Sequence, residues 1–281
     1  MNSVSLAYSP CPNDTFIFAA WTNGLLPDAP PVKVILDDVE ALNEAAREGK
    51  HMLTKVSYGA IPFLTDKYQI LRSGGALGRG CGPLLIARPD RSDAPKDLRA
   101  LPARPKIAIP GKMTTAYALL RMALGRTPDI VEMRFDRIVE SVAKGEVHAG
   151  LIIHESRFTY QRAGLIAYAD LGHWWESLTG KPIPLGAILV RRDVDPKTAH
   201  AYNATIAASL RFAHEHDSRV IEYIRAHATE MDEDVMRAHI ATYVNEFSED
   251  VGEEGIAAVN EFFKRAAQAD LIPSGVTPEF V

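Results

Sequence analysis

The sequence has few cysteines and no long apolar run. Its 281 residues include two cysteines, Cys11 and Cys81, which form neither a CxxC pair nor a zinc-ligand spacing. We therefore expect a reducing compartment and no metal site. No stretch approaches the roughly 18 apolar residues that cross a bilayer, and residues 1–8 lack the basic region and apolar core of a signal peptide. The sequence thus predicts a cytoplasmic protein with no membrane partner.

A surplus of positive charge is also absent. The formal net charge is −5, which offers no general attraction for nucleic acid, so we expect no nucleic-acid partner. An anionic ligand would need a local positive site instead. The glycine-rich stretch Ser73–Pro83 is neither a GxGxxG turn between strand and helix nor a Walker loop, and the chain contains no HExxH. These absences disfavour a nucleotide-binding domain and a zinc protease.

The pattern of elements that is present indicates an α/β fold. Hydrophobic residues make up 47% and charged residues 24%, which is ordinary for a globular protein, and the length exceeds one simple core. Two strands, Leu84–Ala87 and Ile188–Val190, bracket an α/β segment that opens with a proline- and charge-rich connector, residues 90–105. Where the chain passes twice between two lobes in this way, the two connections form a hinge, and ligands bind in the cleft between the lobes. We therefore predict two lobes: a large lobe of residues 1–88 plus 191–281, and an inserted small lobe of residues 89–190.

Polar residues follow the first expected strand, Val4–Tyr8. The turn Ser9–Thr15 contains two prolines, which stiffen it, and it leads into an apolar helix, Phe16–Trp21. A turn at the carboxyl end of a strand often lines the ligand site of an α/β sheet. Asn13 and Asp14 are therefore candidate ligand-binding residues. Both residue types also cap helices well, and capping alone is the alternative interpretation.

Two further strand ends suit an anion. Lys55 and Ser57 lie on the same side of an extended chain and supply a positive charge beside a hydroxyl; an ordinary surface lysine is the alternative. A later turn from strand to helix carries Lys112, Thr114 and Thr115 at the helix start. Free N–H groups at a helix N-terminus bind a carboxylate or a phosphate, and simple N-capping by Thr114 is the alternative here.

A short apolar strand, Ala149–Ile153, emerges into His154-Glu155-Ser156. Ligands lie at the carboxyl ends of strands, and an imidazole at such an edge is a candidate general base that changes charge near neutral pH. The following carboxylate and hydroxyl would orient it. The alternative is a structural histidine at a strand end, whose ring nitrogens are hydrogen-bonded within the fold. We interpret the histidines of the C-terminal helices as surface or capping residues: His200, His214, His216, His227 and His239.

Two further segments lie in the middle of the chain: a strand followed by a helix, and a second helix that opens with paired tryptophans. Val131–Phe135 is expected as a strand, followed by a helix over Arg137–Lys144. Trp174 and Trp175 open another helix. They either pack against the lobe or form an aromatic wall for a planar ligand, and both interpretations stay open.

Six stretches spread over the chain carry a family resemblance: Ser9–Phe18, Ser73–Gly80, Pro110–Tyr117, Gly150–Tyr160, Pro184–Ile188 and Tyr243–Ser248. They closely resemble the 1,4-dihydroxy-6-naphthoate synthase family of the futalosine route to menaquinone. The resemblance covers essentially the whole chain, and the stretches are long enough to be highly specific.

The resemblance implies a fold, a reaction and a set of site residues. The fold would be two-lobed, like the type II periplasmic binding proteins. The reaction would be a lyase step that cleaves cyclic dehypoxanthinyl futalosine to 1,4-dihydroxy-6-naphthoate without a metal or redox cofactor. Carried onto this sequence, the family's proton acceptor is His154, and its substrate contacts are Lys55-Val56-Ser57 and Thr114-Thr115. The substrate would be a small anionic molecule.

Two other functions compete with this one. A non-catalytic solute-binding protein for a small anion would share the lobes and the cleft. The lack of a signal peptide or lipobox cysteine counts against it, and so does an imidazole that faces the cleft, for which such a protein has no evident need. A chorismate dehydratase of the same pathway would share the fold, and the segment His154–Tyr160 is unlike it. The oligomeric state does not follow from the sequence.

Overall fold

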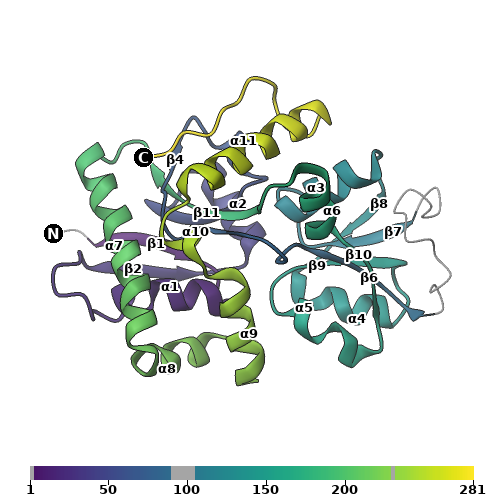
Figure 1. The fold of residues 1–281 in the computed structure, drawn as a ribbon, viewed down its shortest axis with the longest axis horizontal. Coiled ribbons are helices and arrows are strands. Elements are labelled where there is room, and N and C mark those ends of the chain that lie inside the picture. Colours follow the sequence, from purple (N-terminus) through teal and green to yellow (C-terminus); the bar gives the residue numbers. More distant parts are fainter. Residues whose placement is uncertain (1–2, 90–104, 229–231) are drawn as a thin grey trace.

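The computed structural model describes residues 3–89, 105–228 and 232–281. Figure 1 shows two β-sheets side by side, each with helices packed on it, and both chain ends belong to the same half of the molecule. The α/β prediction is therefore confirmed. The connector expected over residues 90–105 lies, apart from its last residue, outside the described residues.

The first sheet has six strands in the order β2-β1-β3-β11-β4, and β5 also pairs with β11. β1 runs parallel to β2 and β3, whereas β11 runs antiparallel to its neighbours. All five residues of β3 are buried, as expected for a central strand, while the edge strand β2 is partly exposed. The strands are β1 (Val4–Tyr8), β2 (Val32–Leu36), β3 (Leu53–Ser57), β4 (Tyr68–Ile70), β5 (Ala76–Gly78) and β11 (Ile183–Arg191).

Helices from both ends of the chain cover this first sheet. Beyond its polar first turn, the first helix is apolar on all sides, and it is buried because it packs against the C-terminal helices α7, α8 and α9. The N-terminal strands thus share one core with the C-terminal helices, as the sequence predicted. The helices are α1 (Pro12–Thr22), α2 (Val39–Arg47), α7 (Pro196–Glu215), α8 (Asp217–His227), α9 (Glu233–Tyr243), α10 (Glu246–Glu249) and α11 (Gly252–Gln268).

The second sheet has five strands in the order β10-β6-β9-β7-β8. β7 runs parallel to β8 and β9, and β6 runs antiparallel to β9 and β10. The strands are β6 (Leu84–Ala87), β7 (Lys106–Ile109), β8 (Asp129–Glu132), β9 (Ala149–Ile152) and β10 (Ile166–Asp170), and the helices are α3 (Thr115–Leu124), α4 (Ile138–Ala143), α5 (Ser156–Thr159) and α6 (Leu171–Thr179).

The chain passes from one sheet to the other twice. β5 ends at Gly78 in the first sheet and β6 begins at Leu84 in the second; β10 ends at Asp170 in the second and β11 begins at Ile183 in the first. The passages end at Leu84 and Ile183, before the boundaries 88/89 and 190/191 that we predicted from the sequence, so β6 belongs to the second sheet and β11 to the first. We propose that these two connections are the crossings between the lobes and form the hinge.

The carboxyl ends of the parallel strands carry the polar residues of interest. In the first sheet β1 and β3 end at Tyr8 and Ser57; in the second, β7 and β9 end at Ile109 and Ile152. Parallel strands end at a common edge of their sheet, and ligands lie outside such edges. Each sheet therefore contributes two strand ends to one site.

One predicted strand ends earlier than expected. We predicted Val131–Phe135, whereas β8 ends at Glu132 and Phe135 begins a 3₁₀ turn. β8 is the edge strand, and its last pair joins Glu132 to Ile109, the end of its partner β7. The chain turns inward once this partner ends, which buries the Phe135 ring. Within residues 3–89, 105–228 and 232–281, no helix combines the length and the apolarity that a bilayer crossing requires.

Candidate active site

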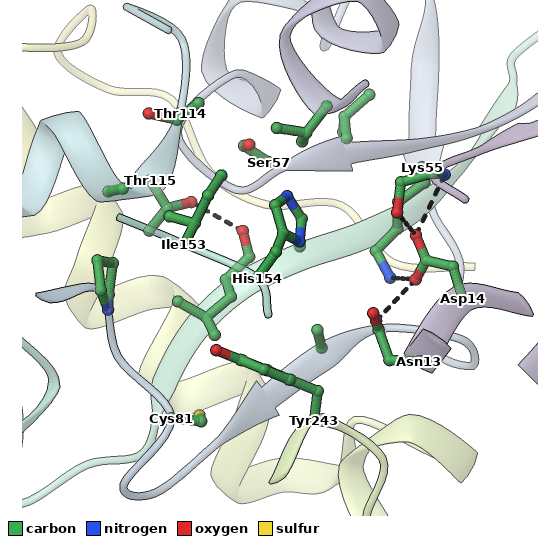
Figure 2. A pocket seen from close by; sticks show the side chains of 18 of the residues that line it. Asn13, Asp14, Lys55, Ser57, Cys81, Thr114, Thr115, Ile153, His154 and Tyr243 are labelled. Carbon is green, nitrogen blue, oxygen red and sulfur yellow. Dashed lines mark hydrogen bonds and ion pairs between the residues drawn. The ribbon is translucent and has the colours of Figure 1, made fainter. Parts of the chain in front are cut away.

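A cavity lies where the strand ends of the two sheets meet. It has an empty volume of about 670 Å³, its open mouth included, which suits a small-molecule ligand. Figure 2 shows His154 near the middle of the view, with Thr114 and Thr115 on one side and Asp14 and Lys55 on the other. Apart from Lys112, the residues that we predicted to be catalytic or to bind the ligand line this cavity: Asn13, Asp14, Lys55, Val56, Ser57, Thr114, Thr115 and His154.

His154 stands just beyond the end of β9 with a left-handed backbone, at a φ of 56°. Non-glycine residues in this conformation cost about 1–3 kcal/mol and cluster at functional sites. Its Nδ1 lies 3.3 Å from Cys11 Sγ, and the Phe135 ring packs edge-on at 4.9 Å between centroids. Within the described part of the chain, its Nε2 is buried without a hydrogen-bond partner. One ring nitrogen is therefore fixed by the protein and the other is left for a ligand.

Burial sets the charge state of this ring. Desolvation lowers the pKa of His154, although the nearby Glu155 and Asp14 oppose the shift. Burial likewise raises the pKa of the Cys11 thiol well above its ordinary value. The contact is therefore between a neutral imidazole and a protonated thiol near neutral pH. When the single N–H of this ring is on Nδ1, facing Cys11 Sγ, the imidazole presents the lone pair of Nε2 to the cavity.

Lys55 is paired inside the protein. Its Nζ lies 2.6 Å from Asp14 Oδ1, and the two side chains are only 7% and 2% exposed. Ser9 Oγ donates to Asp14 Oδ2 at 2.7 Å, and Asn13 Nδ2 donates to Asp14 Oδ1 at 2.9 Å. We predicted from the sequence that Lys55 would bind an anion, but its positive charge is balanced by the carboxylate of Asp14.

Asn13 and Asp14 do not cap α1. The helix begins at Pro12, four residues before the start that we predicted, and its N-cap is Cys11, which makes no side-chain cap bond. Proline fits the first helical position because its fixed φ is already helical and its missing N–H would be unpaired there anyway. Both polar side chains fall in the first turn of the helix and line the cavity. The capping interpretation was wrong for both residues.

His239 corrects the interpretation of the C-terminal histidines. We expected it as a surface or capping residue, but it lies within α9, is 1% exposed and lines the cavity. It shares the buried face of α9 with Val235 and Tyr243, at the i±4 spacing of one helix side. That apolar spacing is the sequence signal that could have identified it. Burial lowers the pKa of His239 well below its ordinary value, and the nearby His154 and Lys55 lower it further.

A chain of hydrogen bonds assigns the tautomer of His239. Asn13 Nδ2 is engaged by the Asp14 carboxylate, so Asn13 Oδ1 faces His239 Nε2 at 2.9 Å and must accept a proton from it. The Nδ1 of this neutral ring then carries a lone pair. That nitrogen lies 3.7 Å from Glu155 Oε2.

The hydroxyl of Thr114 serves the structure of the loop and helix. Thr114 Oγ1 accepts from the Tyr117 N–H at 3.2 Å, as an N-cap does, and donates to the Gly111 carbonyl at 2.8 Å. Capping therefore accounts for this side chain. The N–H groups of Thr115 and Ala116 fall in the first turn of α3, where a helix offers them no internal acceptor, and both residues line the cavity.

Thr115 ties the second sheet to the first. Its Oγ1 donates to the Leu185 carbonyl of β11 at 2.9 Å and accepts from the Gly59 N–H at 3.0 Å. A Cβ at Gly59 would come within 2.9 Å of the Met113 carbonyl oxygen and the Thr115 nitrogen. Glycine is therefore needed at this approach between the two halves of the site.

Lys112 and the tryptophans lie away from the cavity. The side chain of Lys112 is 63% exposed, and its Nζ lies 3.3 Å from Glu132 Oε2. Trp175 is fully buried, donates to the Pro182 carbonyl at 3.0 Å and packs against Phe262. Neither Lys112, Trp174 nor Trp175 is among the lining residues. The packing interpretation holds for the tryptophans.

The chain is similar to known menaquinone enzymes along its whole length. A family model described as "Menaquinone biosynthesis" matches residues 4–268. The 1,4-dihydroxy-6-naphthoate synthase of Thermus thermophilus is 49% identical over 282 residues, which cover 100% of both chains. The enzyme of the same name from Streptomyces coelicolor is 42% identical over 278 residues, 97% of this chain and 96% of that one.

Solved structures agree on the fold. A crystal structure of an Archaeoglobus fulgidus protein superposes with a TM-score of 0.87 at 32% identity, over 96% of this chain and 98% of that one. The alkanesulfonate-binding protein SsuA of Xanthomonas axonopodis pv. citri, solved with MOPS, superposes with a TM-score of 0.72 at 14% identity, over 97% and 94%. The predicted two-lobed fold, like that of the periplasmic binding proteins, is confirmed. The chain belongs to the menaquinone biosynthesis family of enzymes, together with the two 1,4-dihydroxy-6-naphthoate synthases.

Proposed function

We propose that the cavity binds cyclic dehypoxanthinyl futalosine and that the enzyme cleaves it to 1,4-dihydroxy-6-naphthoate, with His154 as the proton acceptor. The observation that carries the proposal is the Nε2 of a neutral imidazole, buried without a protein partner among the described residues, in the wall of the cavity. The names of the two relatives, 49% and 42% identical to this chain, support the choice of reaction.

The base acts through a fixed tautomer. With the Nδ1 proton facing Cys11 Sγ, the lone pair of Nε2 accepts a proton from the carbon acid of the substrate. The electron pair left on carbon then drives cleavage of the carbon–carbon bond, and formation of the aromatic naphthoate ring supplies driving force. Burial favours this role twice, because it keeps the ring neutral and because it removes competing water.

The anionic part of the substrate belongs at the start of α3. Thr114 and Thr115 stand there, but each hydroxyl already donates its proton to a backbone carbonyl. The donors that we assign to the substrate's carboxylate are therefore the first-turn N–H groups, which also carry the positive end of the helix dipole. Ser57 and the Lys55–Asp14 pair would hold another polar part of the molecule.

The lobes would close around the substrate. Closure at the two crossings between the sheets would shield the base from water while the substrate fragments. The cavity wall already combines apolar side chains, such as Ile153 and Leu185, with the polar groups described above. A site of this composition orients a largely planar, mostly apolar substrate through a few polar contacts.

Mass spectrometry of the products tests the reaction. Purified protein incubated with cyclic dehypoxanthinyl futalosine should yield 1,4-dihydroxy-6-naphthoate. Recovery of the compound unchanged after long incubation would contradict the proposal and favour a solute-binding protein, as the alkanesulfonate-binding protein SsuA is. A parallel incubation with chorismate tests the remaining alternative, because turnover of chorismate would make the protein a dehydratase. Each of the three outcomes gives a distinct mass.

A further inference from the structure

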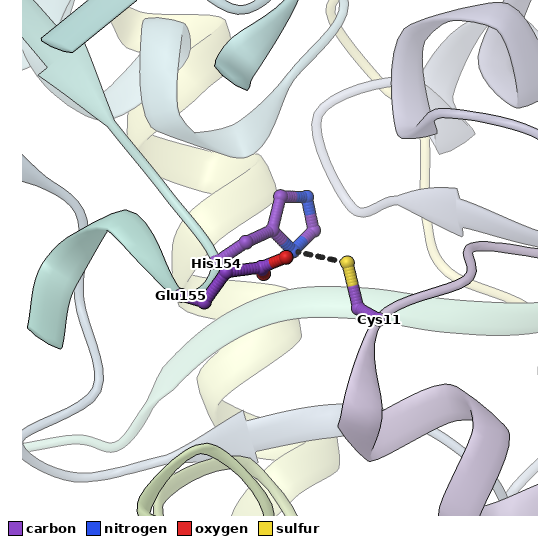
Figure 3. A group of neighbouring side chains, drawn as sticks. All are labelled: Cys11, His154 and Glu155. Carbon is purple, nitrogen blue, oxygen red and sulfur yellow. Dashed lines mark hydrogen bonds between the residues drawn. The ribbon is translucent and has the colours of Figure 1, made fainter. Parts of the chain in front are cut away.

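Three potential metal ligands meet beside the cavity. Figure 3 shows the Cys11 thiol and the carboxylate of Glu155 on the same side of the His154 ring. One ligand atom from each residue lies within 4.8 Å of the other two, and Nδ1 of His154 is 3.3 Å from Cys11 Sγ. The reaction proposed above uses only His154 directly, so the cluster as a whole has no assigned purpose.

Glu155 makes this cluster unusual. Its side chain is buried, with the residue 6% exposed, and within the described residues neither carboxylate oxygen has a hydrogen-bond partner. His239 Nδ1 lies 3.7 Å from Glu155 Oε2, but it carries a lone pair and cannot donate. The protonated Cys11 thiol beside Glu155 is only a weak donor, and a buried carboxylate without a strong donor is costly. A cation placed between Glu155, Cys11 and His154 would satisfy it.

We propose that Cys11, His154 and Glu155 form a binding site for a thiophilic divalent cation, of which Zn²⁺ is the best match. A thiolate, an imidazole and a carboxylate are ligands that zinc accepts together. Sulfur and nitrogen donors disfavour Mg²⁺ and Ca²⁺, which prefer oxygen. The thiolate and the carboxylate together balance the two positive charges, so the occupied site would be neutral in its buried setting.

The distances suit a tetrahedral ion. Bonds of 2.0–2.3 Å to zinc place neighbouring ligand atoms about 3.5 Å apart. The separation between Sγ and Nδ1 is already 3.3 Å, and no pair of the three ligand atoms exceeds 4.8 Å. A small movement of the Glu155 side chain toward the ion would complete three positions of the tetrahedron. The fourth would be taken by water from the cavity.

Proton accounting links this site to the base. Binding requires that the Cys11 thiol lose its proton to solvent, because thiolates and not thiols bind metals. It also requires the lone pair of His154 Nδ1, so the imidazole proton moves to Nε2. Nε2 then donates and can no longer accept a proton from the substrate. If His154 is the proton acceptor proposed above, the ion is a reversible inhibitor. The binding site itself does not depend on that role.

The ion would also join the two halves of the molecule. Cys11 precedes α1 on the first sheet, whereas His154 and Glu155 follow β9 of the second. A metal held by both sides would oppose any opening of the lobes. Thermal unfolding of the zinc-bound protein should therefore occur at a higher temperature than that of the metal-free protein.

Cobalt binding followed by absorption tests the site. Chelator-treated, full-length protein is titrated with Co²⁺, which reports a thiolate ligand through a charge-transfer band in the near ultraviolet and a tetrahedral site through intense visible bands. We expect both at one equivalent, and displacement by Zn²⁺. No charge-transfer band at excess Co²⁺ would overturn the proposal.

Matched variants locate the ligands. Cys11 and Cys81 are both free and buried, so Cys11→Ser should abolish the charge-transfer band while Cys81→Ser keeps it. Glu155→Gln should weaken Co²⁺ binding by more than about tenfold, because even changes outside the ligand shell cost about 10–100-fold. Far-ultraviolet circular dichroism of each variant checks the fold. A band that survives Cys11→Ser and disappears in Cys81→Ser would overturn the assignment.

Turnover measurements separate the two parts of the inference. Zn²⁺ should inhibit the enzyme with the midpoint found in the displacement titration, and chelator should restore the rate. Stoichiometric binding without inhibition would leave the metal site standing and overturn its link to the base. An inactive protein that still binds Co²⁺ would contradict the proposed reaction and leave the metal site intact.

Discussion

The two sides of the cavity satisfy their polar groups very differently. On the first sheet, Lys55, Asp14 and Asn13 form a closed network in which the ion pair measures 2.6 Å. On the second sheet, His154 Nε2 and both oxygens of Glu155 are buried without partners in the described part of the chain. Satisfied networks hold a structure rigid, whereas unpartnered buried groups are those left to react or to bind. We infer that the first side positions the substrate and that the second performs the chemistry.

Breaking the closed network should produce the largest loss of stability. Lys55→Met leaves the Asp14 carboxylate buried without its counter-charge, and removal of one partner of a buried pair costs about 3–5 kcal/mol. Urea unfolding at pH 7 measures the effect. The double variant Lys55→Met/Asp14→Asn should recover a large part of it, because no uncompensated charge remains. If the free energy of unfolding of the single variant falls by less than about 1 kcal/mol, the ion pair behaves as a solvent-exposed pair and the prediction is contradicted.

The hydrogen bond of His239 should have the next largest effect. His239→Leu removes the donor to Asn13 Oδ1 and leaves that buried oxygen unpaired, which costs about 1–3 kcal/mol. His239→Gln can still donate from its amide and should lose less. His200 on α7 is exposed, so His200→Leu serves as the control and should change stability by no more than about 0.5 kcal/mol. Equal losses at the two positions would contradict the assigned bond.

The dependence of stability on pH should follow from both buried histidines. Burial lowers the pKa of His154 and of His239 below the ordinary value of 6.5, so the unfolded chain binds protons before the folded one does. The free energy of unfolding should therefore be highest above pH 6.5 and fall as the pH drops below it, by at most about 1.4 kcal/mol per pH unit for each histidine. Urea unfolding between pH 7 and pH 5 measures the slope, and His239→Gln should flatten it. An unchanged slope would contradict burial as the cause.

Lys112 should have the smallest effect. It is an exposed lysine paired with Glu132 outside the cavity, and exposed pairs contribute about 0–1 kcal/mol. Lys112→Ala should therefore change the unfolding free energy by less than about 1 kcal/mol and leave KM nearly unchanged. A rise of about tenfold in KM, which corresponds to about 1.4 kcal/mol of binding, would mean that this side chain reaches the substrate and that the α3 terminus alone does not hold the anion.

Much of the cavity was predictable because strand ends are local features of the sequence. The runs before Ser9 and His154 are short and largely apolar, and each leads into polar residues, whereas the strand that ends at Ser57 itself carries Lys55 and Ser57 on one side. Their meeting follows from the rule that ligands lie at the carboxyl ends of strands. The two-lobed arrangement likewise follows from the order of strands and helices along the chain.

The partners of these residues were not predictable from local pattern. Cys11 and His154 are 143 residues apart, and Asn13 and His239 are 226 apart. The meeting of strand ends from the two sheets brings the first pair together, and the packing of α1 against α9 brings the second pair together. The pairing of Lys55 with Asp14 joins two residues that we had both selected, yet nothing in either segment indicates it. A zinc-ligand spacing could not be found for the same reason, because the three ligands come from two distant segments.

The central claim, that the unpartnered Nε2 of His154 is the base, has one direct test. His154→Asn and the wild-type protein are each mixed with cyclic dehypoxanthinyl futalosine, and substrate affinity and single-turnover rate are measured on the same samples. We predict an affinity within a few-fold of wild type and a rate lower by about 10²–10⁴-fold, the usual contribution of a general base. A rate within a few-fold of wild type would contradict the claim.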